Sequence, residues 1–330
     1  MKDSEPERKL LAAWPMAVFR HVRFFLLASA LLVGCTTVGS SPEGPDSAPD
    51  EPESLDGGIA ADAPSSPDAG MDEAAPDAGV PGLPRISMAR VVVQSQVEPF
   101  RGDQPKLPGD AAVKGVQQAL ADEGFDVTVD GWFGNETAAA YSAWQKSLGY
   151  SGLGANGIPG PSSLTALGED RFEVQHKIDV GPHTTFTGRT VNQRTADMLA
   201  QADSMLAHSI VLSQGSYNAG GVSASAGTHD GGGVVDISVS ALSTKQRWQT
   251  VKALRTVGFA AWLRTPDQGP WPYHIHAVAI GDTDMSTSAR NQVADYYVGK
   301  NALASHAADN TPSEYRAPFT WWEKVQGQGN

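Results

Sequence analysis

The 330-residue sequence contains a single cysteine and is poor in basic side chains, with 24 lysines and arginines against 37 aspartates and glutamates. One cysteine excludes both a disulfide framework and any cysteine-rich zinc module. A formal charge of −13 argues against a nucleic-acid-binding protein, because such a protein needs a basic patch to neutralise phosphates. We therefore expect no nucleic-acid partner.

Several common catalytic motifs are also missing. The sequence has no G-x-S-x-G elbow, no P-loop, and no G-x-G-x-x-G following a predicted strand. A serine hydrolase of the elbow type and a nucleotide-dependent enzyme therefore have no support.

The acidity is concentrated in residues 36–84, which hold eleven acidic side chains, no lysine or arginine, and nine of the 22 prolines. This segment also lacks aromatic residues, so it cannot bury enough apolar surface to offset its ordering entropy. We expect residues 36–107 to form a disordered acidic Pro/Ala-rich linker and connector. The remainder of the chain is nearly neutral, which removes any argument for an acidic binding face.

Residues 24–34 (FFLLASALLVG) form an apolar run behind Arg20 and Arg23. The run is too short to span a bilayer and has the length of a signal-peptide core. It ends in Leu32-Val33-Gly34-Cys35, which resembles the lipobox of bacterial lipoproteins. The resemblance implies a signal peptide over residues 1–35, lipidation of Cys35, and attachment to a membrane of the cell envelope.

Residues 108–168 show three short helical patterns separated by glycine-rich turns. The first follows Pro108-Gly109-Asp110 and stops at Gly124, the second begins at Asn135 or Glu136 and stops at Gly149, and the third fits Ser162 to Leu167. The strings VQQAL at 116–120, VDGWFG at 129–134 and GIPG at 157–160 resemble the bacterial peptidoglycan-binding domain of the three-helix type. The resemblance implies a small all-α domain with peptidoglycan as its partner. We expect Asp130 to form a turn rather than to contact sugar.

The residues that indicate chemistry lie in a second module, at 172–312. His229 and Asp236 are seven residues apart across a glycine turn, and residues 234–239 have the composition of a strand. A second predicted strand over 273–280 places His274 and His276 on one face, because side chains alternate along a strand. Two imidazoles and a carboxylate can thus converge, which gives Zn²⁺ three protein ligands and an open position.

His229, Gly232, Asp236, His274 and His276 follow the pattern of the zinc D-Ala-D-Ala carboxypeptidase family, which shares its fold with the hedgehog signalling domain. The resemblance implies one zinc ion held by His229, Asp236 and His276. It implies that His274 acts as the general base or as a cation that stabilises the oxyanion. It also implies an α+β fold, in which a small antiparallel sheet carries the metal and helices pack on the sheet.

Two positions depart from that pattern. The family has serine two residues before the first ligand, where this chain has Gly227, with Ser225 nearby. It also has an arginine about fifteen residues before that ligand, for the terminal carboxylate of the substrate, and here Gln214 stands near that place. We take Gln214 and Ser225 as candidate substrate-binding residues. Arg255 and Arg264 are alternatives, although surface or stacking roles are the stronger expectation for both.

The sequence therefore predicts an α-helical peptidoglycan-binding domain followed by an α+β zinc peptidase domain, in a monomer tethered to the membrane and the wall. The predicted function is hydrolysis of peptide bonds in peptidoglycan stem peptides, of the D,D-carboxypeptidase kind. A non-catalytic peptidoglycan-binding lipoprotein and a D,D-endopeptidase that cuts cross-links remain alternatives. Residues 313–330, with Trp321 and Trp322, either pack on the peptidase domain or form a tail.

Overall fold

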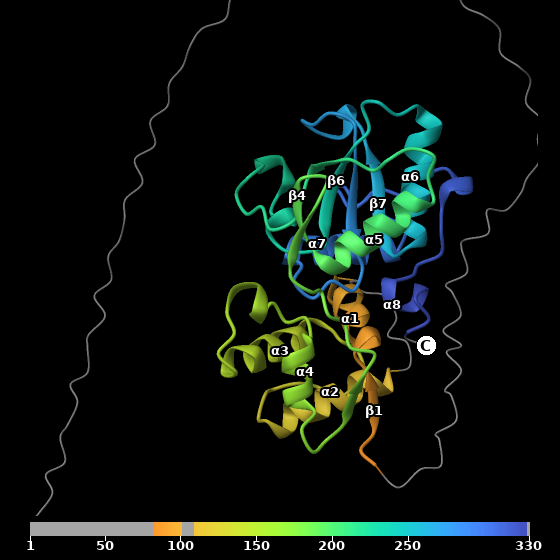
Figure 1. The fold of residues 1–330 in the computed structure, drawn as a ribbon. Coiled ribbons are helices and arrows are strands. Elements are labelled where there is room, and N and C mark those ends of the chain that lie inside the picture. Colours follow the sequence, from red (N-terminus) through yellow and green to blue (C-terminus); the bar gives the residue numbers. More distant parts are fainter. Residues whose placement is uncertain (1–81, 101–108, 329–330) are drawn as a thin grey trace, which may run out of the picture. The chain divides into compact units, whose positions relative to one another are not determined.

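The computed structural model describes residues 82–100 and 109–328 (Figure 1). The predicted signal peptide, Cys35 and most of the predicted linker lie outside the described residues. Within the two described stretches, no helix has the length and apolar character needed to cross a membrane.

The first module contains the three predicted helices, α2 (Ala111–Asp122), α3 (Asn135–Ser147) and α4 (Pro161–Leu167). Helix α2 begins where the Oδ1 atom of Asp110 accepts hydrogen bonds from the backbone of Ala112 and Val113, at 2.8 and 3.2 Å. Pro161 is the first residue of α4, a position where its missing N–H costs no helical hydrogen bond. The helical character predicted for this module is confirmed.

The prediction of a disordered connector is wrong for residues 85–97. They form strand β1 (Arg85–Ser87) and helix α1 (Met88–Val97), which the short helix η1 (Glu98–Phe100) follows. Strand β1 pairs in parallel with β2 (Glu173–Gln175), and α1 buries Val91 and Val92 completely. Residues 85–97 do not share the acidic, proline-rich composition of residues 36–84, because they carry an apolar helical face.

Helix α1 is also hydrogen-bonded to a turn of the second module. The side-chain amide of Gln96 donates to the carbonyl of Asp282 at 2.9 Å and accepts from the N–H of Gly281 at 2.8 Å. Both groups of a fully buried amide are thereby satisfied, which fixes α1 against this turn.

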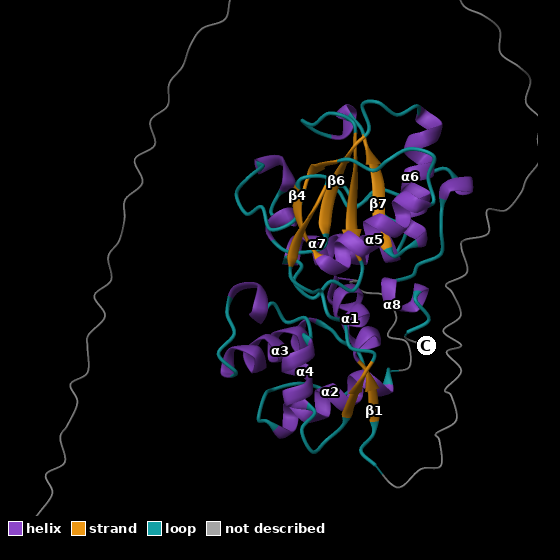
Figure 2. Cartoon of the chain, in the orientation of Figure 1, coloured by secondary structure: helices purple, strands orange, loops and turns teal. Residues whose placement is uncertain are grey.

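The second module is built on a four-stranded sheet with the order β5-β6-β8-β7, in which every neighbouring pair is antiparallel (Figure 2). The predicted antiparallel sheet, the strands expected at 234–239 and 273–280, and the helix expected over 246–257 are confirmed. The elements in chain order are β3 (His183–Phe186), β4 (Arg189–Asn192), α5 (Gln193–Ser204), β5 (Leu212–Gln214), η3 (Ser223–Ser225), η4 (Thr228–Asp230), β6 (Val234–Ser238), α6 (Thr244–Thr256), β7 (Phe259–Arg264), η5 (Pro266–Gln268), β8 (His274–Ala279), α7 (Thr287–Tyr297), η6 (Ser313–Tyr315) and α8 (Trp322–Val325).

The two faces of the sheet bury different sets of side chains, as the alternation of a strand requires. One face, with Ile237 and Leu263, packs with residues of α5 and α6 in one apolar cluster. The other face contributes Val234, Trp262 and Val278 to a second cluster, which also contains residues of α7 and α1. The predicted metal ligands of β6 and β8 belong to the α7 face, because Asp236 and His276 are each two residues from a member of this second cluster.

The segment after residue 312 packs on the sheet domain, which resolves the two alternatives left open for it. Trp321 is buried, and Glu323 at the start of α8 forms a buried ion pair with Arg194 of α5, with Nε and Oε1 2.7 Å apart. The Nη2 atom of Arg194 also donates to the carbonyl of Ile280. Residues 321–325 are therefore part of the folded domain.

Candidate metal centre

Three elements bring the predicted metal ligands together. Asp236 on β6 lies directly opposite His276 on β8 in the antiparallel register, and His229 comes from η4, just before β6. The Nδ1 atom of His276 is 2.8 Å from Oδ1 of Asp236, and Nε2 of His229 is 3.4 Å from the same oxygen. One ligand atom from each of the three residues lies within 4.8 Å of the others. The cluster is the geometry that a three-ligand metal site requires.

Glycines hold the loop that presents His229. A Cβ atom on Gly231 would lie 2.3 Å from the carbonyl oxygen of Asp284, so only glycine allows this approach of the two backbones. Gly233 has a φ of +77°, in the left-handed region that other residues rarely adopt. The N–H of Gly232 donates to the same Asp284 carbonyl at 2.9 Å. The glycine run before β6 thus allows the loop that carries His229 to pack closely against the backbone of Asp284.

Protein oxygen atoms hold the rings of His229 and His276 so that one nitrogen of each ring points toward Asp236. Nδ1 of His229 lies 2.9 Å from the carbonyl oxygen of Gly215, which can only accept, so Nδ1 carries the proton and Nε2 faces Asp236. Nε2 of His276 lies 2.8 Å from Oε1 of Gln292 on α7, which accepts a hydrogen bond, and Nδ1 lies 2.8 Å from Oδ1 of Asp236. Such oriented partners of the second nitrogen are a regular feature of metal-binding histidines.

The protonation states also suit a cation. Burial, which Asp236 only partly offsets, lowers the pKa of His276, so its imidazole is neutral at pH 7. Burial alone would raise the pKa of Asp236, but the facing side chains of His229 and His276 outweigh it and hold that pKa below its ordinary value. A metal ion would replace any proton on the ring nitrogens that face Asp236, because histidine and carboxylate ligands bind a metal in their deprotonated forms. The donor set fits a metal ion.

His274 lies beside this cluster in a distinct environment. Its Nδ1 atom is 2.8 Å from the carbonyl oxygen of Pro272, which leaves Nε2 as the free nitrogen, 3.8 Å from Oδ1 of Asp236. The ring is packed edge-to-face against Trp271, with ring centroids 6.2 Å apart. His274 therefore lies next to the three predicted ligands with Nε2 toward the cluster, where the sequence predicts a general base or a cation that stabilises the oxyanion.

A cavity of about 100 Å³ opens over the cluster. Gln214 and Ser225, the predicted substrate-binding residues, both line it and are hydrogen-bonded to each other, with Nε2 and Oγ 3.1 Å apart. The structure thus brings all six predicted site residues of this module to one cavity. The complete lining is Gln214, Val222, Ala224, Ser225, Thr228, His229, Asp236, Arg264, Trp271, His274, His276, Gln292 and Leu303.

Sequence reasoning missed Gln292 and Trp271 among the residues of this site. Gln292 follows His276 by sixteen residues on another element, and no fixed spacing marks it. Of the surface or stacking roles expected for Arg255 and Arg264, the structure shows stacking: they lie over the rings of Tyr296 and Trp262 respectively, and both are buried. For Arg264 a signal existed, since it lies opposite His274 in the register of β7 and β8.

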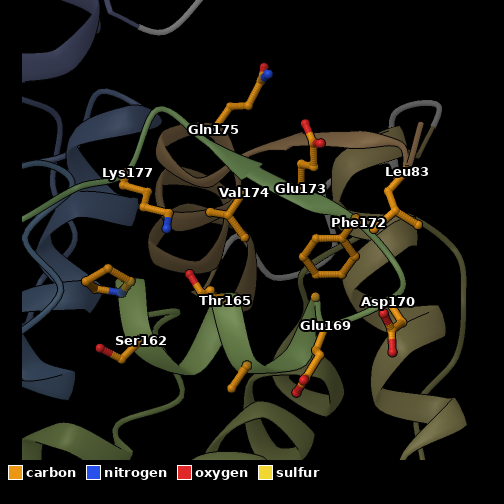
Figure 3. Close-up of a pocket in the computed structure, with 13 residues that line it drawn as sticks. Leu83, Ser162, Thr165, Glu169, Asp170, Phe172, Glu173, Val174, Gln175 and Lys177 are labelled. Atoms are coloured by element: carbon orange, nitrogen blue, oxygen red, sulfur yellow. The ribbon is translucent and has the colours of Figure 1, made fainter. Parts of the chain in front are cut away.

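A larger cavity of about 960 Å³ lies elsewhere (Figure 3). Its lining comes from α4, with Ser162 and Thr165, from residues 168–177, and from Leu83. It shares no residue with the cavity over the histidines. Within residues 82–100 and 109–328, one cluster has at least three potential metal ligands, and it consists of His229, Asp236 and His276. The histidine-lined cavity is therefore the candidate chemical site.

In the helical module, Asp130 has the turn role predicted for it. Its Oδ1 atom accepts from the N–H of Trp132 at 2.9 Å and from the side chain of Gln117 at 3.0 Å. The side-chain Oε1 atom of Gln117 accepts in turn from the backbone N–H groups of Asp130 and Gly131, at 3.0 and 2.7 Å. The string VDGWFG at 129–134 thus forms a turn that these hydrogen bonds hold.

Residues 109–167, which contain all three helices of this module, match the family of peptidoglycan binding domains. The match indicates an association with the cell wall. A comparison of the chain with curated proteins found no match. The matched residues end with α4, before the first strand of the sheet that carries the histidine cluster.

Proposed function

We propose that this protein is a zinc-dependent hydrolase of peptide bonds in peptidoglycan stem peptides. The single observation that carries the proposal is the orientation of three imidazoles. Each ring donates one N–H to a protein oxygen, of Gly215, Gln292 or Pro272, and directs its other nitrogen at Asp236. A structural carboxylate does not need three imidazole rings oriented in this way, whereas a catalytic metal site uses such oriented rings.

The residues divide into ligands and a proton carrier. His229, Asp236 and His276 would hold the ion, and two histidines with one carboxylate form a donor set that suits Zn²⁺. When bound, zinc supplies Lewis-acid polarisation of the scissile carbonyl and makes water acidic enough to attack at neutral pH. His274 receives a proton on Nε2 and passes it to the leaving amine, while its Nδ1–H bond to Pro272 keeps the ring in place.

The choice of substrate rests on the helical module. Its match to peptidoglycan binding domains supports peptidoglycan as the partner, a polymer whose cross-linked stem peptides supply peptide bonds. Binding of the wall by one module raises the local concentration of those bonds at the other. We extend the proposal to a lipid on Cys35, which would hold the protein at the envelope membrane with residues 36–84 as its tether.

The test is an incubation of the purified, zinc-loaded protein with muropeptides, with mass spectrometry of the products. Loss of a terminal D-alanine is the expected result, and a chelator should abolish it. Conversion of dimers to monomers would show an endopeptidase instead. The matched controls are His274→Ala, which should bind zinc without turnover, and His306→Ala, an exposed histidine paired with Asp295, which should leave turnover unchanged. Zinc-loaded protein that sediments with sacculi yet leaves every muropeptide intact would refute the enzyme.

A further inference from the structure

The cavity over the histidines contains a buried cation that the proposed metal site does not use. Arg264, the last residue of β7, is 3% exposed, lines the cavity, and stands opposite His274 in the strand register. Its Nη1 atom donates to the carbonyl of Asn301 at 2.6 Å. Its Nη2 atom is buried and has no hydrogen-bond partner among the described residues. An unsatisfied buried donor of a charged group is costly, so its retention calls for a ligand.

Two other buried arginines of the same domain are paired with carboxylates. Arg194 pairs with Glu323 at 2.7 Å and Arg255 pairs with Asp309 at 2.8 Å. Arg264 forms no ion pair with any described residue. Burial lowers the pKa of Arg264 to about 10, against smaller opposing effects of Asp236 and Asp309, so the guanidinium stays charged at neutral pH. A charged, unpaired guanidinium that lines a cavity is suited to an anion.

A second unsatisfied donor lines the same cavity. The Nε1 atom of Trp271 is buried and, within the described stretches, has no hydrogen-bond partner. Trp271 also contacts His274, the proposed proton carrier, through its ring. The cavity therefore offers two unused N–H donors, one of them cationic, on the side of the sheet formed by β7 and the loop before β8.

We infer that Arg264 and Trp271 form an anion subsite that binds a carboxylate of the peptide substrate. This inference rests on the proposed function and deepens it, because a carboxylate beside the reacting atoms is the free C-terminus of a carboxypeptidase substrate. Gln214, which stands near the place of the arginine expected from sequence resemblance, lies on β5 at the opposite edge of the sheet. Arg264 supplies the charge from the β7 edge, so the substrate's C-terminus lies on that side.

The experiment compares two acyl-D-Ala-D-Ala peptides that differ in one group, a free C-terminal carboxylate or a carboxamide. Hydrolysis is measured with zinc-loaded protein, and binding is measured by calorimetry in the His274→Ala background, which has no turnover. Wild-type protein should prefer the carboxylate by about tenfold or more in both measurements, the range expected for one charge-assisted hydrogen bond. Arg264→Gln should bring the ratio close to one, and Trp271→Phe should lower it in part.

The controls separate a missing charge from a damaged fold. Arg264→Lys keeps the charge and should keep much of the preference for the carboxylate peptide. If Arg264→Gln does not fold, the Arg264→Lys variant is measured in its place. Arg255→Gln removes a buried arginine that is fully paired and does not line the cavity, so it should leave the ratio unchanged. Because the ratio compares two peptides on one sample, it does not depend on the folded fraction.

The outcomes distinguish a failure of the proposed anion subsite from a failure of the proposed hydrolase activity. A preference that survives in Arg264→Gln, or a wild-type protein that treats both peptides alike, overturns the subsite. If neither peptide is hydrolysed but the preference in binding disappears with Arg264, the hydrolase proposal fails and the subsite stands.

Discussion

The Nε2–H of His276 donates to the side-chain oxygen of Gln292 across the space between β8 and α7, with 2.8 Å between the two atoms. The amide nitrogen of Gln292 donates to the carbonyl of Ala302, which fixes the orientation of the amide. Through this pair, a helix that contributes no ligand decides which nitrogen of His276 faces Asp236.

Replacing Gln292 should therefore weaken metal binding without removing a ligand. We expect Gln292→Leu to lower zinc affinity by roughly 10- to 100-fold, the usual effect of losing such an orienting partner. Gln292→Glu, which keeps the acceptor and increases the basicity of the ring, should retain the affinity. Competition with a chromophoric chelator measures both constants, and equal affinities for wild type and Gln292→Leu would remove the orienting role.

Metal binding should stabilise the sheet domain. Zinc at about 100 times its dissociation constant should raise the free energy of unfolding by about 2.7 kcal/mol if the unfolded chain does not bind it. Asp236→Asn and His276→Ala should abolish this increase, whereas His274→Ala should keep it. Thermal unfolding with and without zinc, alongside metal analysis of the dialysed proteins, distinguishes the ligands from their neighbour. A zinc-dependent increase that persists in Asp236→Asn would contradict the assigned ligand set.

Asp282 should make stability depend on pH in the opposite sense to most carboxylates. Burial, partly offset by Asn192 and Arg194, raises the pKa of Asp282 to about 6. The folded protein therefore holds a proton that the unfolded chain releases near pH 4, so this contribution to stability is complete below pH 4 and is lost as the pH rises through 6.

The comparison that isolates this effect is wild type against Asp282→Asn in urea unfolding, with chelator present throughout. Between pH 4 and pH 7.5 the wild type should lose roughly 2–3 kcal/mol relative to the variant. Other titrating groups, including the low-pKa Asp236, act on both proteins alike and cancel in the difference. A pH-independent difference would mean that Asp282 is ionised in the folded state at pH 4.

The buried pair of Arg194 and Glu323 should be sensitive to the loss of either partner. Glu323→Ala leaves the guanidinium of Arg194 buried without its carboxylate, and we expect a loss of about 3–5 kcal/mol in the free energy of unfolding. The double variant Arg194→Met/Glu323→Leu should recover most of that loss, because neither charge remains. Chemical denaturation gives all three values. A loss below about 1 kcal/mol for Glu323→Ala would show that α8 does not pack as described.

Local signals in the sequence were sufficient for the helices and the ligand strands. Asp110, Gly149 and Pro161 mark helix ends by backbone chemistry that acts within a few residues, and the alternation around His274 and His276 predicts a strand with one polar face. Hence α2, α3, α4, β6 and β8 were placed close to their observed bounds.

What the sequence could not show depends on contacts between distant residues. Gln292 reaches His276 because α7 packs on the sheet, and no local pattern shows that Arg255 pairs with Asp309 while Arg264 forms no ion pair with a described residue. The ordered segment at 85–97 was missed for a related reason: its apolar face is stable only against α7 and the sheet, which lie about 200 residues further along the chain.

The packing of α1 changes how the two modules are connected. This helix precedes the peptidoglycan-binding module in the chain, yet its buried valines and Gln96 belong to the core beside the turn at Gly281. The helical module is thus an insertion within a discontinuous sheet domain rather than an appendage at its end. A fragment that begins at residue 172 would lack a piece of its own core, and cleavage at a single point between the modules would not set either one free.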